Sequence, residues 1–470
     1  MRFPLKIFLL LFITCTIHVS AQNFYFGNDL SYIHEMEDCG AGYAENGVIK
    51  DPYAILKDHG CNLVRLRLWH TPSWYDALNL GNRYSDLNDV ILSSYRAKSL
   101  GMQVLLDFQL SDTWADPTHQ VVPAAWASVV DNLPVLQDSL YQYIYKTLSI
   151  LSQAQLTPDI VQIGNETNKG ILLSQQVNDQ GWSVDWARNS ALFNTAIDAV
   201  RDLEVATGDT IKVALHIADP SELNWWIDQF WTHGVQDFDI IGVSYYQQYH
   251  QDLIPAVGAA ISNMKAIYPG KAVMILETAY PWTSGFDDNA NNLLHTVYPG
   301  YPFSPQNQKQ WLIDLTQTVI NHGGSGVVYW EPGWVSTACH TQFGQGSNWE
   351  NCTFFDFNDN LLNDGGVGWM SHVYDFTSAT QEINGGKDSF HFYQSENEII
   401  ISTENPLLLN GPMEIEFHSL DGKMIFNEKI NPSWENNTLH IAIPNIVGGC
   451  YLVRLLINGY APINHLFFQK

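Results

Sequence analysis

The feature that most constrains the fold is an alternation of strand-like and helix-like segments between Phe24 and Phe376. Eight apolar runs are predicted to be strands: 24–30, 62–69, 102–109, 159–166, 211–216, 238–246, 272–277 and 326–330. Amphipathic segments of helical length separate them, for example 86–100, 135–153, 186–205, 255–267 and 307–322. Eight βα units in about 350 residues predict a closed (β/α)8 barrel of the α/β class. No glycine-rich phosphate loop follows the first strand, which argues against a dinucleotide-binding sheet.

The character of the chain changes after about Thr377, where short strand-like runs replace the long amphipathic segments. The predicted strands are 390–402, 413–418, 424–427, 439–443 and 450–456. Turn pairs such as Asp421-Gly422 and Gly448-Gly449 stand between them. We therefore expect a catalytic barrel over residues 22–376 and a small all-β, sandwich-like domain over 377–470.

The charge and composition of the chain limit the classes of molecule that it is expected to bind. Lys and Arg total 22 and Asp and Glu total 49, which gives a formal charge of 22 − 49 = −27. A surface this acidic argues against binding nucleic acid or anionic lipid. Aromatic residues reach 13 %, with 16 Trp, and their flat apolar faces suit either a large core or sugar rings.

The first 21 residues have the pattern of an export signal. Arg2 and Lys6 precede an apolar run over 7–17, and Val19-Ser20-Ala21 resembles a small-residue cleavage site. The run is too short to span a bilayer, and no later apolar run is long enough to do so. We expect residues 1–21 to be a signal peptide and the protein to be secreted or held at the cell surface. A lipid anchor on Cys15 is the alternative.

Five cysteines follow the predicted cleavage site: Cys39, Cys61, Cys339, Cys352 and Cys450. None forms a CxxC pair, so a structural zinc site is not expected. Cys339 and Cys352 flank one polar loop and are the predicted disulfide. Cys61 begins an apolar strand and is expected to be a buried thiol.

Two glutamates stand where a barrel carries its chemistry, at the carboxyl ends of strands. Glu166 ends the fourth predicted strand and Glu277 the seventh, and each follows an apolar run that should reduce its solvation. Two facing carboxylates are the minimum apparatus for hydrolysing a glycosidic bond, since one donates a proton and the other attacks. The alternative is that each glutamate forms an ion pair at the end of its strand.

The second predicted strand carries two arginines on one face. Strand alternation places Arg65, Arg67 and Trp69 together. Arg67 lies nearer the functional end, where its guanidinium would keep a nucleophilic carboxylate ionised. Arg65 is expected to form a structural ion pair inside the barrel.

Other strand ends supply groups suited to holding a sugar. Trp330 could form the floor of a subsite, and the hydroxyl of Tyr245 or Tyr246 could hydrogen-bond the nucleophile. Polar loops are usually only solvated, yet four residues at the end of the third strand and in the loop after it are candidates to bind sugar hydroxyls: Asp107, Gln109, Asp112 and Trp114.

Taken together, the residues resemble glycoside hydrolase family 53, the arabinogalactan endo-β-1,4-galactanases. Matching stretches run in family order from about Phe24 to Phe376, among them Asn62 to Trp69, Val161 to Asn168 and Glu277 to Tyr280. The resemblance implies a retaining (β/α)8 hydrolase of pectic galactan. Glu166 is then the general acid/base and Glu277 the nucleophile. Asn165 would bind the sugar 2-hydroxyl, and Arg67 and a tyrosine of the sixth strand would support the nucleophile.

At several positions the sequence departs from the family pattern, so the kind of polysaccharide backbone that the protein cleaves is not fixed by the resemblance. Gln109-Leu110 replaces His-Tyr, Gln247-Gln248 replaces Pro and an aromatic residue, and His70-Thr71 replaces Asn-Asp. These positions lie where substrate is held rather than where the bond is cleaved. A related β-glycanase acting on mannan or glucan is therefore the first alternative, and a non-catalytic sugar-binding barrel is the second.

The resemblance also bears on metals and assembly. Some bacterial relatives hold calcium in the loops after the seventh and eighth strands, where Asp287, Asp288 and Asn289 supply oxygen ligands. A solvated turn is the alternative, and we expect that no cofactor is required for catalysis. The expected form is a monomer whose partner is the polysaccharide.

The C-terminal domain resembles the sorting domains of proteins that Bacteroidetes export by the type IX pathway. Ser419 to Lys423, Gly448 to Arg454 and the terminal Lys470 carry the likeness. The alternative is a carbohydrate-binding or purely structural β-sandwich.

Overall fold

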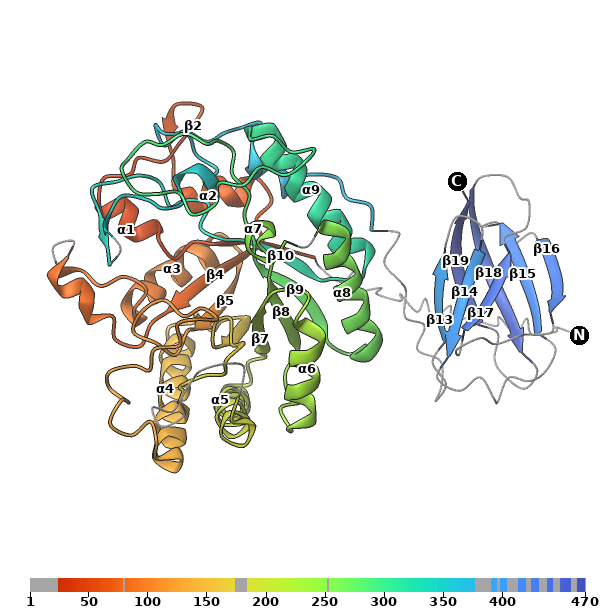
Figure 1. Ribbon diagram of the computed structural model, residues 1–470, viewed down its shortest axis with the longest axis horizontal. Helices are drawn as coiled ribbons and strands as arrows, with labels where there is room; N and C mark the ends of the chain where they lie inside the picture. Colours follow the sequence, from red (N-terminus) through yellow and green to blue (C-terminus); the bar gives the residue numbers. More distant parts are fainter. Residues whose placement is uncertain are drawn as a thin grey trace, which may run out of the picture. The chain divides into compact units, whose positions relative to one another are not determined.

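The computed structural model describes residues 24–78, 81–173, 184–251, 253–342 and 344–376, together with seven strands between 390 and 469 (Figure 1). The chain divides into two compact units between Tyr374 and Asp375. Each unit has its own sheet structure, and each is described separately.

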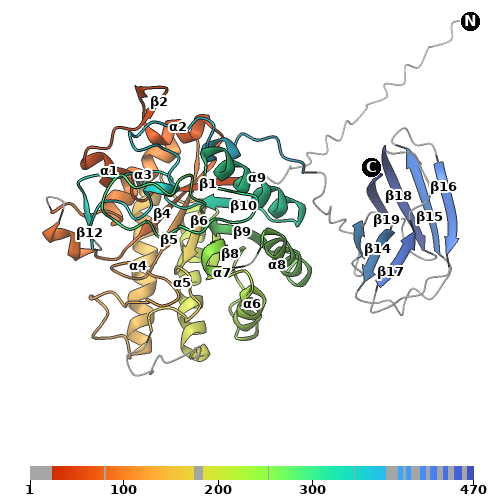
Figure 2. The same ribbon diagram turned by 45° about the horizontal axis from the view of Figure 1, so that its top comes forward.

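The first unit is a closed barrel of eight parallel strands surrounded by helices, as the sequence predicted (Figure 2). The barrel strands are β1 (Tyr25–Asp29), β4 (Leu63–Leu68), β5 (Gln103–Phe108), β6 (Ile160–Ile163), β7 (Lys212–Ala218), β8 (Ile240–Ser244), β9 (Ala272–Glu277) and β10 (Gly326–Tyr329). Each strand pairs with the next one in sequence, and β10 pairs with β1 to close the ring. Two short antiparallel hairpins, β2 (Ala44–Glu45) with β3 (Val48–Ile49) and β11 (His340–Thr341) with β12 (Gly344–Gln345), lie in the loops.

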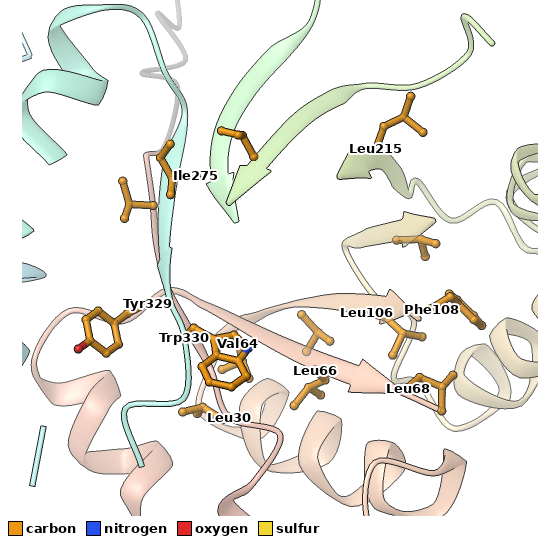
Figure 3. Packing of buried hydrophobic residues seen from close by; sticks show 14 of the residues in the cluster. Leu30, Val64, Leu66, Leu68, Leu106, Phe108, Leu215, Ile275, Tyr329 and Trp330 are labelled. Carbon is orange, nitrogen blue, oxygen red and sulfur yellow. The ribbon is translucent and has the colours of Figure 1, made fainter. Parts of the chain in front are cut away.

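Strand alternation divides the core of the barrel into an inner and an outer layer. Side chains that include Leu63, Leu105 and Met274 form one buried cluster from facing strands, which fills the inside of the ring. Their sequence neighbours belong to a second, larger cluster with the helices, and Figure 3 shows Leu66 and Leu106 within it. Because both faces are buried, the strands read as nearly continuous apolar runs.

Several of the helices around the barrel begin at a residue whose side chain caps the helix. They are α1 (Ile33–Asp38), α2 (Pro52–Asp58), α3 (Leu87–Ser99), α4 (Leu133–Gln153), α5 (Trp186–Thr207), α6 (Leu223–Thr232), α7 (Gln247–His250), α8 (Ile254–Ile267) and α9 (Pro305–Asn321). The Asp86 carboxylate caps α3 by accepting from the Asp89 backbone N–H. Helix α5 ends at Gly208, whose φ of 78° lies in the left-handed region that glycine tolerates.

One predicted strand proved too long at its functional end. The predicted fourth strand reached Glu166, but β6 ends at Ile163. Gly164 and Glu166 both adopt positive φ, 73° and 44°, so the chain turns sharply before the glutamate. A side chain at Gly164 would meet Thr167 Cγ2 at 2.6 Å, so the turn leaves no room for a Cβ there.

The predicted disulfide between Cys339 and Cys352 is wrong. Cys339 pairs instead with Cys39, which follows α1, and Cys352 is a buried free cysteine. The prediction assumed local pairing across one loop, whereas the fold brings together two cysteines 300 residues apart in sequence. Cys61 is a buried free thiol as expected.

The second unit is all-β, as predicted, and its strands form two antiparallel sheets. One sheet has the order β13 (Phe390–Gln394), β14 (Glu398–Thr403) and β17 (Thr438–Ala442), and the other has the order β16 (Met424–Ile430), β15 (Met413–Ser419), β18 (Gly449–Ile457) and β19 (Ile463–Gln469). Met413, Ile415 and Phe417 are buried on one face of β15. The predicted strand 390–402 is two paired strands, and β19 was not predicted.

Several predictions concern residues that the structure does not describe. The proposed signal peptide, 1–21, lies outside the described residues, as do the turn at 420–423 and Lys470 of the sorting-domain motif. Within the described part of the chain, none of the helices is both long and apolar enough to cross a membrane.

Candidate active site

Two buried glutamates meet at the carboxyl ends of the barrel strands. Glu277 is the last residue of β9, and Glu166 lies three residues beyond β6. Their exposed fractions are 6 % and 9 %. The negative charge of Glu277 acts directly on Glu166, so the fold brings the two predicted catalytic residues into one site.

Glu277 is held by a cation and a hydroxyl. Arg65 Nη1 lies 2.8 Å from Glu277 Oε1, and the Tyr246 hydroxyl donates to Oε2 at 3.1 Å. Burial raises the pKa of Glu277 above its ordinary value, while the charge of Arg65 opposes that shift. Both contacts favour the ionised form of this carboxylate.

Arg65, and not Arg67, is the arginine that contacts Glu277, so the predicted roles of the two arginines are reversed. Every N–H direction of Arg65 is used: Nη1 also binds Asp29 at 2.8 Å, Nη2 binds Asp107 at 2.8 Å and Asn165 at 2.7 Å, and Nε binds Gln162 at 3.1 Å. One guanidinium therefore neutralises part of the charge of three buried carboxylates.

Arg67 lies nearer the carboxyl end of β4 than Arg65, on the same inner face of the barrel. It packs against a group of aromatic rings that we call the aromatic wall, formed by Tyr32, Trp69, Trp114 and Trp330. Its Nη1 donates to Glu331 Oε1 at 3.2 Å, and its Cζ lies 4.8, 4.5 and 4.1 Å from the ring centroids of Tyr32, Trp69 and Trp114. Residues two apart in a strand share a face but occupy different heights in the barrel, which explains why the two arginines find different partners.

Glu166 lacks the direct contact with Arg65 that Glu277 has. Burial, followed by the charge of Glu277, raises the pKa of Glu166 to about 8. Arg65 lowers this pKa, but less than burial and Glu277 raise it. When the pair shares one proton, the proton therefore resides on Glu166 and the negative charge on Glu277.

The predicted sugar-binding residues fall into two groups. Trp330 is 9 % exposed, and its ring contacts the rings of Trp114 and Trp349 at 5.6 and 4.6 Å, so it forms part of the aromatic wall. Figure 3 shows Trp330 beyond the end of β10. Tyr246 reaches the Glu277 carboxylate, whereas the fully buried Tyr245 stacks on Trp311 of α9.

The other three residues predicted to bind sugar hydroxyls are hydrogen-bonded to groups of the protein itself. Asp107 is fully buried, and its two oxygens accept from Arg65 and Gln162. Gln109 Oε1 accepts from Trp69 Nε1 at 2.7 Å. Both oxygens of Asp112 accept backbone N–H groups, those of Thr71 and Ala124.

Three further residues of the site were not predicted. Glu331 is fully buried with a φ of 50°, and its second oxygen accepts from the Tyr32 backbone N–H. His216 near the end of β7 and Ser244 at the end of β8 are both fully buried beside Asn165 and Glu166. His216 and Ser244 could have been found from the sequence, because each is a polar residue near the end of an otherwise apolar strand.

Two of the three candidate calcium ligands, Asp287 and Asp288, make hydrogen bonds within the loops. Asp288 accepts backbone N–H groups at both oxygens, from Ala290 at 2.7 Å and Ser347 at 2.7 Å. Asp287 contributes its backbone N–H to Glu350. Among the residues that the structure describes, no cluster of three or more metal-ligating side chains is present. Asp287 and Asp288 thus contribute hydrogen bonds to the loop structure, and calcium binding stays a prediction.

The chain is similar in sequence to known glycoside hydrolases, in agreement with the pair of glutamates at the strand ends. The model of glycosyl hydrolase family 53 matches residues 25–364. An arabinogalactan endo-β-1,4-galactanase of Cellvibrio japonicus (strain Ueda107) is 48 % identical over 335 residues, covering 71 % of this chain and 86 % of that protein. An endo-β-1,4-galactanase of Bacillus subtilis (strain 168) is 33 % identical over 331 residues, covering 68 % and 72 %.

A solved structure of the same family has the same fold. The GH53 catalytic domain of Ignisphaera aggregans superposes with a TM-score of 0.67 at 32 % identity, covering 75 % of this chain and 97 % of that one. The family match spans more than half of the chain and coincides with the barrel that carries both glutamates. On sequence and on structure alike, this chain belongs to glycosyl hydrolase family 53.

Proposed function

We propose that the protein is a secreted, retaining endo-β-1,4-galactanase that cleaves the galactan and arabinogalactan side chains of pectin. The observation that carries the proposal is the unequal environment of the two glutamates. Arg65 and Tyr246 stabilise charge on Glu277, while burial and the neighbouring charge keep a proton on Glu166. One nucleophile and one general acid are what double displacement at a sugar requires.

The reaction then has two steps. Glu277 attacks the anomeric carbon while Glu166 gives its proton to the departing glycosidic oxygen, which leaves a glycosyl ester on Glu277. Glu166, now ionised, takes a proton from water as the water attacks the same carbon, and Glu277 is released. Two inversions at one carbon give retention of the anomeric configuration.

The aromatic wall supplies the surface for the sugar. Trp330 and Trp114 pack edge to face, and both lie just beyond the carboxyl ends of barrel strands, after β10 and β5. The galactan substrate is inferred from the names of the two galactanases to which the chain is 48 % and 33 % identical. From the family resemblance we also propose that Asn165, which accepts from Arg65 and donates to the Ala115 carbonyl, binds the sugar 2-hydroxyl.

The test is release of reducing sugar from debranched β-1,4-galactan, with mannan and carboxymethylcellulose alongside and Glu277→Gln as the inactive control. Activity on galactan that is lost in the control supports the proposal. Activity on mannan or glucan alone would keep the chemistry and replace the substrate. Inactivity on all three would leave a sugar-binding barrel as the better description.

Export is proposed from the two ends of the chain. Residues 1–21 would be removed as a signal peptide, and the all-β unit would act as a type IX sorting domain. N-terminal sequencing of protein from the culture medium tests the first part, and secretion of a variant that lacks residues 377–470 tests the second. A mature protein that begins elsewhere than Gln22, or normal export of the shortened variant, would contradict the respective part.

A further inference from the structure

The peptide unit that joins Asn165 to Glu166 is held through both of its polar groups. Its carbonyl, on Asn165, accepts a hydrogen bond from Gln120 Nε2 at 2.9 Å. Its N–H, on Glu166, lies 3.3 Å from His216 Nδ1. Gln120 belongs to the loop after β5 and His216 to β7, so the two groups come from the strands on either side of β6. The two-step mechanism above does not use Gln120.

The orientation of the Gln120 amide follows from its partners. Its Nε2 lies 3.1 Å from the Asp116 carbonyl oxygen, 2.9 Å from that of Asn165 and 3.4 Å from that of Glu166. All three partners are backbone oxygens, which only accept, so the group that faces them must be the NH2. One hydrogen therefore reaches the Asp116 carbonyl. The other reaches the turn that carries Glu166, with the Asn165 carbonyl as its nearer acceptor.

The loop after β5 fixes Gln120 by hydrogen bonds of its own. The Asp116 N–H donates to the His119 carbonyl at 3.0 Å, and Asp116 Oδ1 accepts from the His119 N–H at 2.9 Å. The same loop also reaches the side chain of Asn165, whose Nδ2 donates to the Ala115 carbonyl at 2.8 Å. The half-buried Gln120 amide is therefore presented to the turn from a loop that is already ordered around it.

The held peptide carries a backbone strain. Glu166 has a φ of 44°, in the left-handed region that residues with a side chain rarely adopt. Such a conformation persists only where its surroundings fix it. Rotating the peptide by half a turn would relieve this φ, but it would bring the Glu166 N–H towards the NH2 of Gln120. Two donors would then face each other, so Gln120 disfavours the rotated peptide.

The orientation of this peptide affects the side chain of Glu166 more than that of Asn165. The Asn165 side chain has its own anchor, since its Oδ1 accepts from Arg65 at 2.7 Å. The Glu166 carboxyl lacks the direct contact with Arg65 that Glu277 has, so its direction depends more on the backbone. We propose that Gln120 is a positioning residue, which holds this peptide so that the Glu166 carboxyl faces the glycosidic oxygen.

The inference rests on the proposed function, in which Glu166 gives its proton to the leaving sugar. No bond to Gln120 forms or breaks, and no proton leaves it. Gln120 acts on the geometry of proton transfer, so its effect is greatest where the leaving group most needs a proton. A residue that only supported the loop would change activity equally on every substrate.

The experiment compares two replacements of Gln120 that keep its length. Gln120→Met removes the donor, while Gln120→Glu puts an acceptor in its place, which attracts the Glu166 N–H and favours the rotated peptide. The neutral Met variant separates loss of the donor from the added charge. Gln137→Met is the matched control, because it removes another half-buried amide, one that donates to Thr195 Oγ1 of α5 at 2.8 Å.

Two readouts are used: the crystal structure of each ligand-free variant, and kcat/KM on galactan and on aryl β-galactobiosides whose leaving groups differ in acidity. In Gln120→Glu we expect a rotated peptide and a negative φ at Glu166. On galactan, kcat/KM should fall about tenfold in Gln120→Met and about 10²-fold in Gln120→Glu. Both losses should shrink as the leaving group becomes more acidic. Gln137→Met should match the wild type on every substrate.

An unrotated peptide in Gln120→Glu would overturn the proposal, because the side-chain amide would then not set the plane of the peptide. Equal losses on all leaving groups would also overturn it, because proton donation by Glu166 would not be what had changed. The crystal structures need no substrate, so they test the inference even if galactan proves not to be hydrolysed. Galactan assays on the wild-type enzyme decide the proposed function separately.

Discussion

Arg65 Nη1 contacts Glu277 Oε1 at 2.8 Å, across the barrel from β4 to β9. The same guanidinium also binds Asp29 and Asp107, so three buried carboxylates depend on one cation. Breaking an ion pair inside a protein is costly because the remaining charge stays buried without a partner.

Arg65→Lys is expected to fold and to lose most activity. A lysine keeps one positive charge but cannot donate to Asp107, Asn165 and Glu277 in the same plane. We expect kcat to fall by about 10²-fold or more, and Arg65→Met to lose about 3–5 kcal/mol of unfolding free energy. Steady-state kinetics and urea unfolding measure the two effects. Wild-type kcat in Arg65→Lys would show that the guanidinium fork is not needed.

Glu166→Ala should separate the acid role from the base role. On polysaccharide, activity should fall by about 10²–10⁴-fold, because the leaving sugar needs a proton. On an activated aryl galactoside the first step should survive, and added azide should attack the glycosyl ester and speed turnover. NMR of the galactosyl azide product checks this outcome: attack on the glycosyl ester gives the β-azide, whereas Glu277→Gln, which forms no ester, can give only the α-azide by direct displacement.

The two carboxyl groups should lie about 5–5.5 Å apart, the separation at which retaining enzymes work. A crystal structure of the ligand-free enzyme measures that separation. NMR of the first product formed from a galacto-oligosaccharide reports the anomer. A separation near 9 Å, or an inverted first anomer, would point to direct displacement by water.

Glu166→Gln is expected to stabilise the protein above about pH 5, with a gain that grows towards pH 8. The pKa of Glu166 is raised to about 8 in the folded state, so folding favours its protonated form. Its contribution is therefore intact below the unfolded pKa and is lost as the pH rises through the folded one. The gain for the neutral variant should approach about 2 kcal/mol at pH 8 and vanish near pH 4. Thermal unfolding across this pH range measures the gain in stability. A gain that does not change with pH would show that the raised pKa of Glu166 is not its cause.

Arg67 should matter for stability more than for the chemical step. Arg67→Met leaves the fully buried Glu331 without its cation and should cost about 3–5 kcal/mol. Adding Glu331→Gln should restore part of that loss, because the uncompensated charge is then gone. Denaturant titration of the two single variants and the double variant gives the coupling. Strict additivity would mean that the pair does not interact energetically.

Much of the fold could be predicted because it depends on local patterns. Eight apolar runs separated by amphipathic segments have few other solutions, and the positions of Glu166 and Glu277 follow from the strand ends. The partners of Arg65 and Arg67 could not be read in the same way. Both point inward, and only the stagger of the closed barrel decides which one is level with β9.

Contacts between distant segments escaped prediction for a related reason. Cys39 and Cys339 are joined by the route of the whole chain, so spacing along the sequence favoured the nearer Cys352. Glu331 and His216 read as ordinary strand-end residues. Their importance comes from partners on other strands, Arg67 in one case and Asn165 in the other.

The disulfide between Cys39 and Cys339 gives the ring of strands a covalent lock at its seam. Strands β1 and β10 are the first and last strands of the barrel in sequence, and the disulfide adds a covalent link to the hydrogen bonds and side-chain contacts between them. The first cysteine follows β1 and the second follows β10, so the disulfide ties the segment after the first strand to the segment after the last one. Peptide mapping that found Cys339 joined to Cys352 would therefore identify chains that were oxidised outside the closed ring.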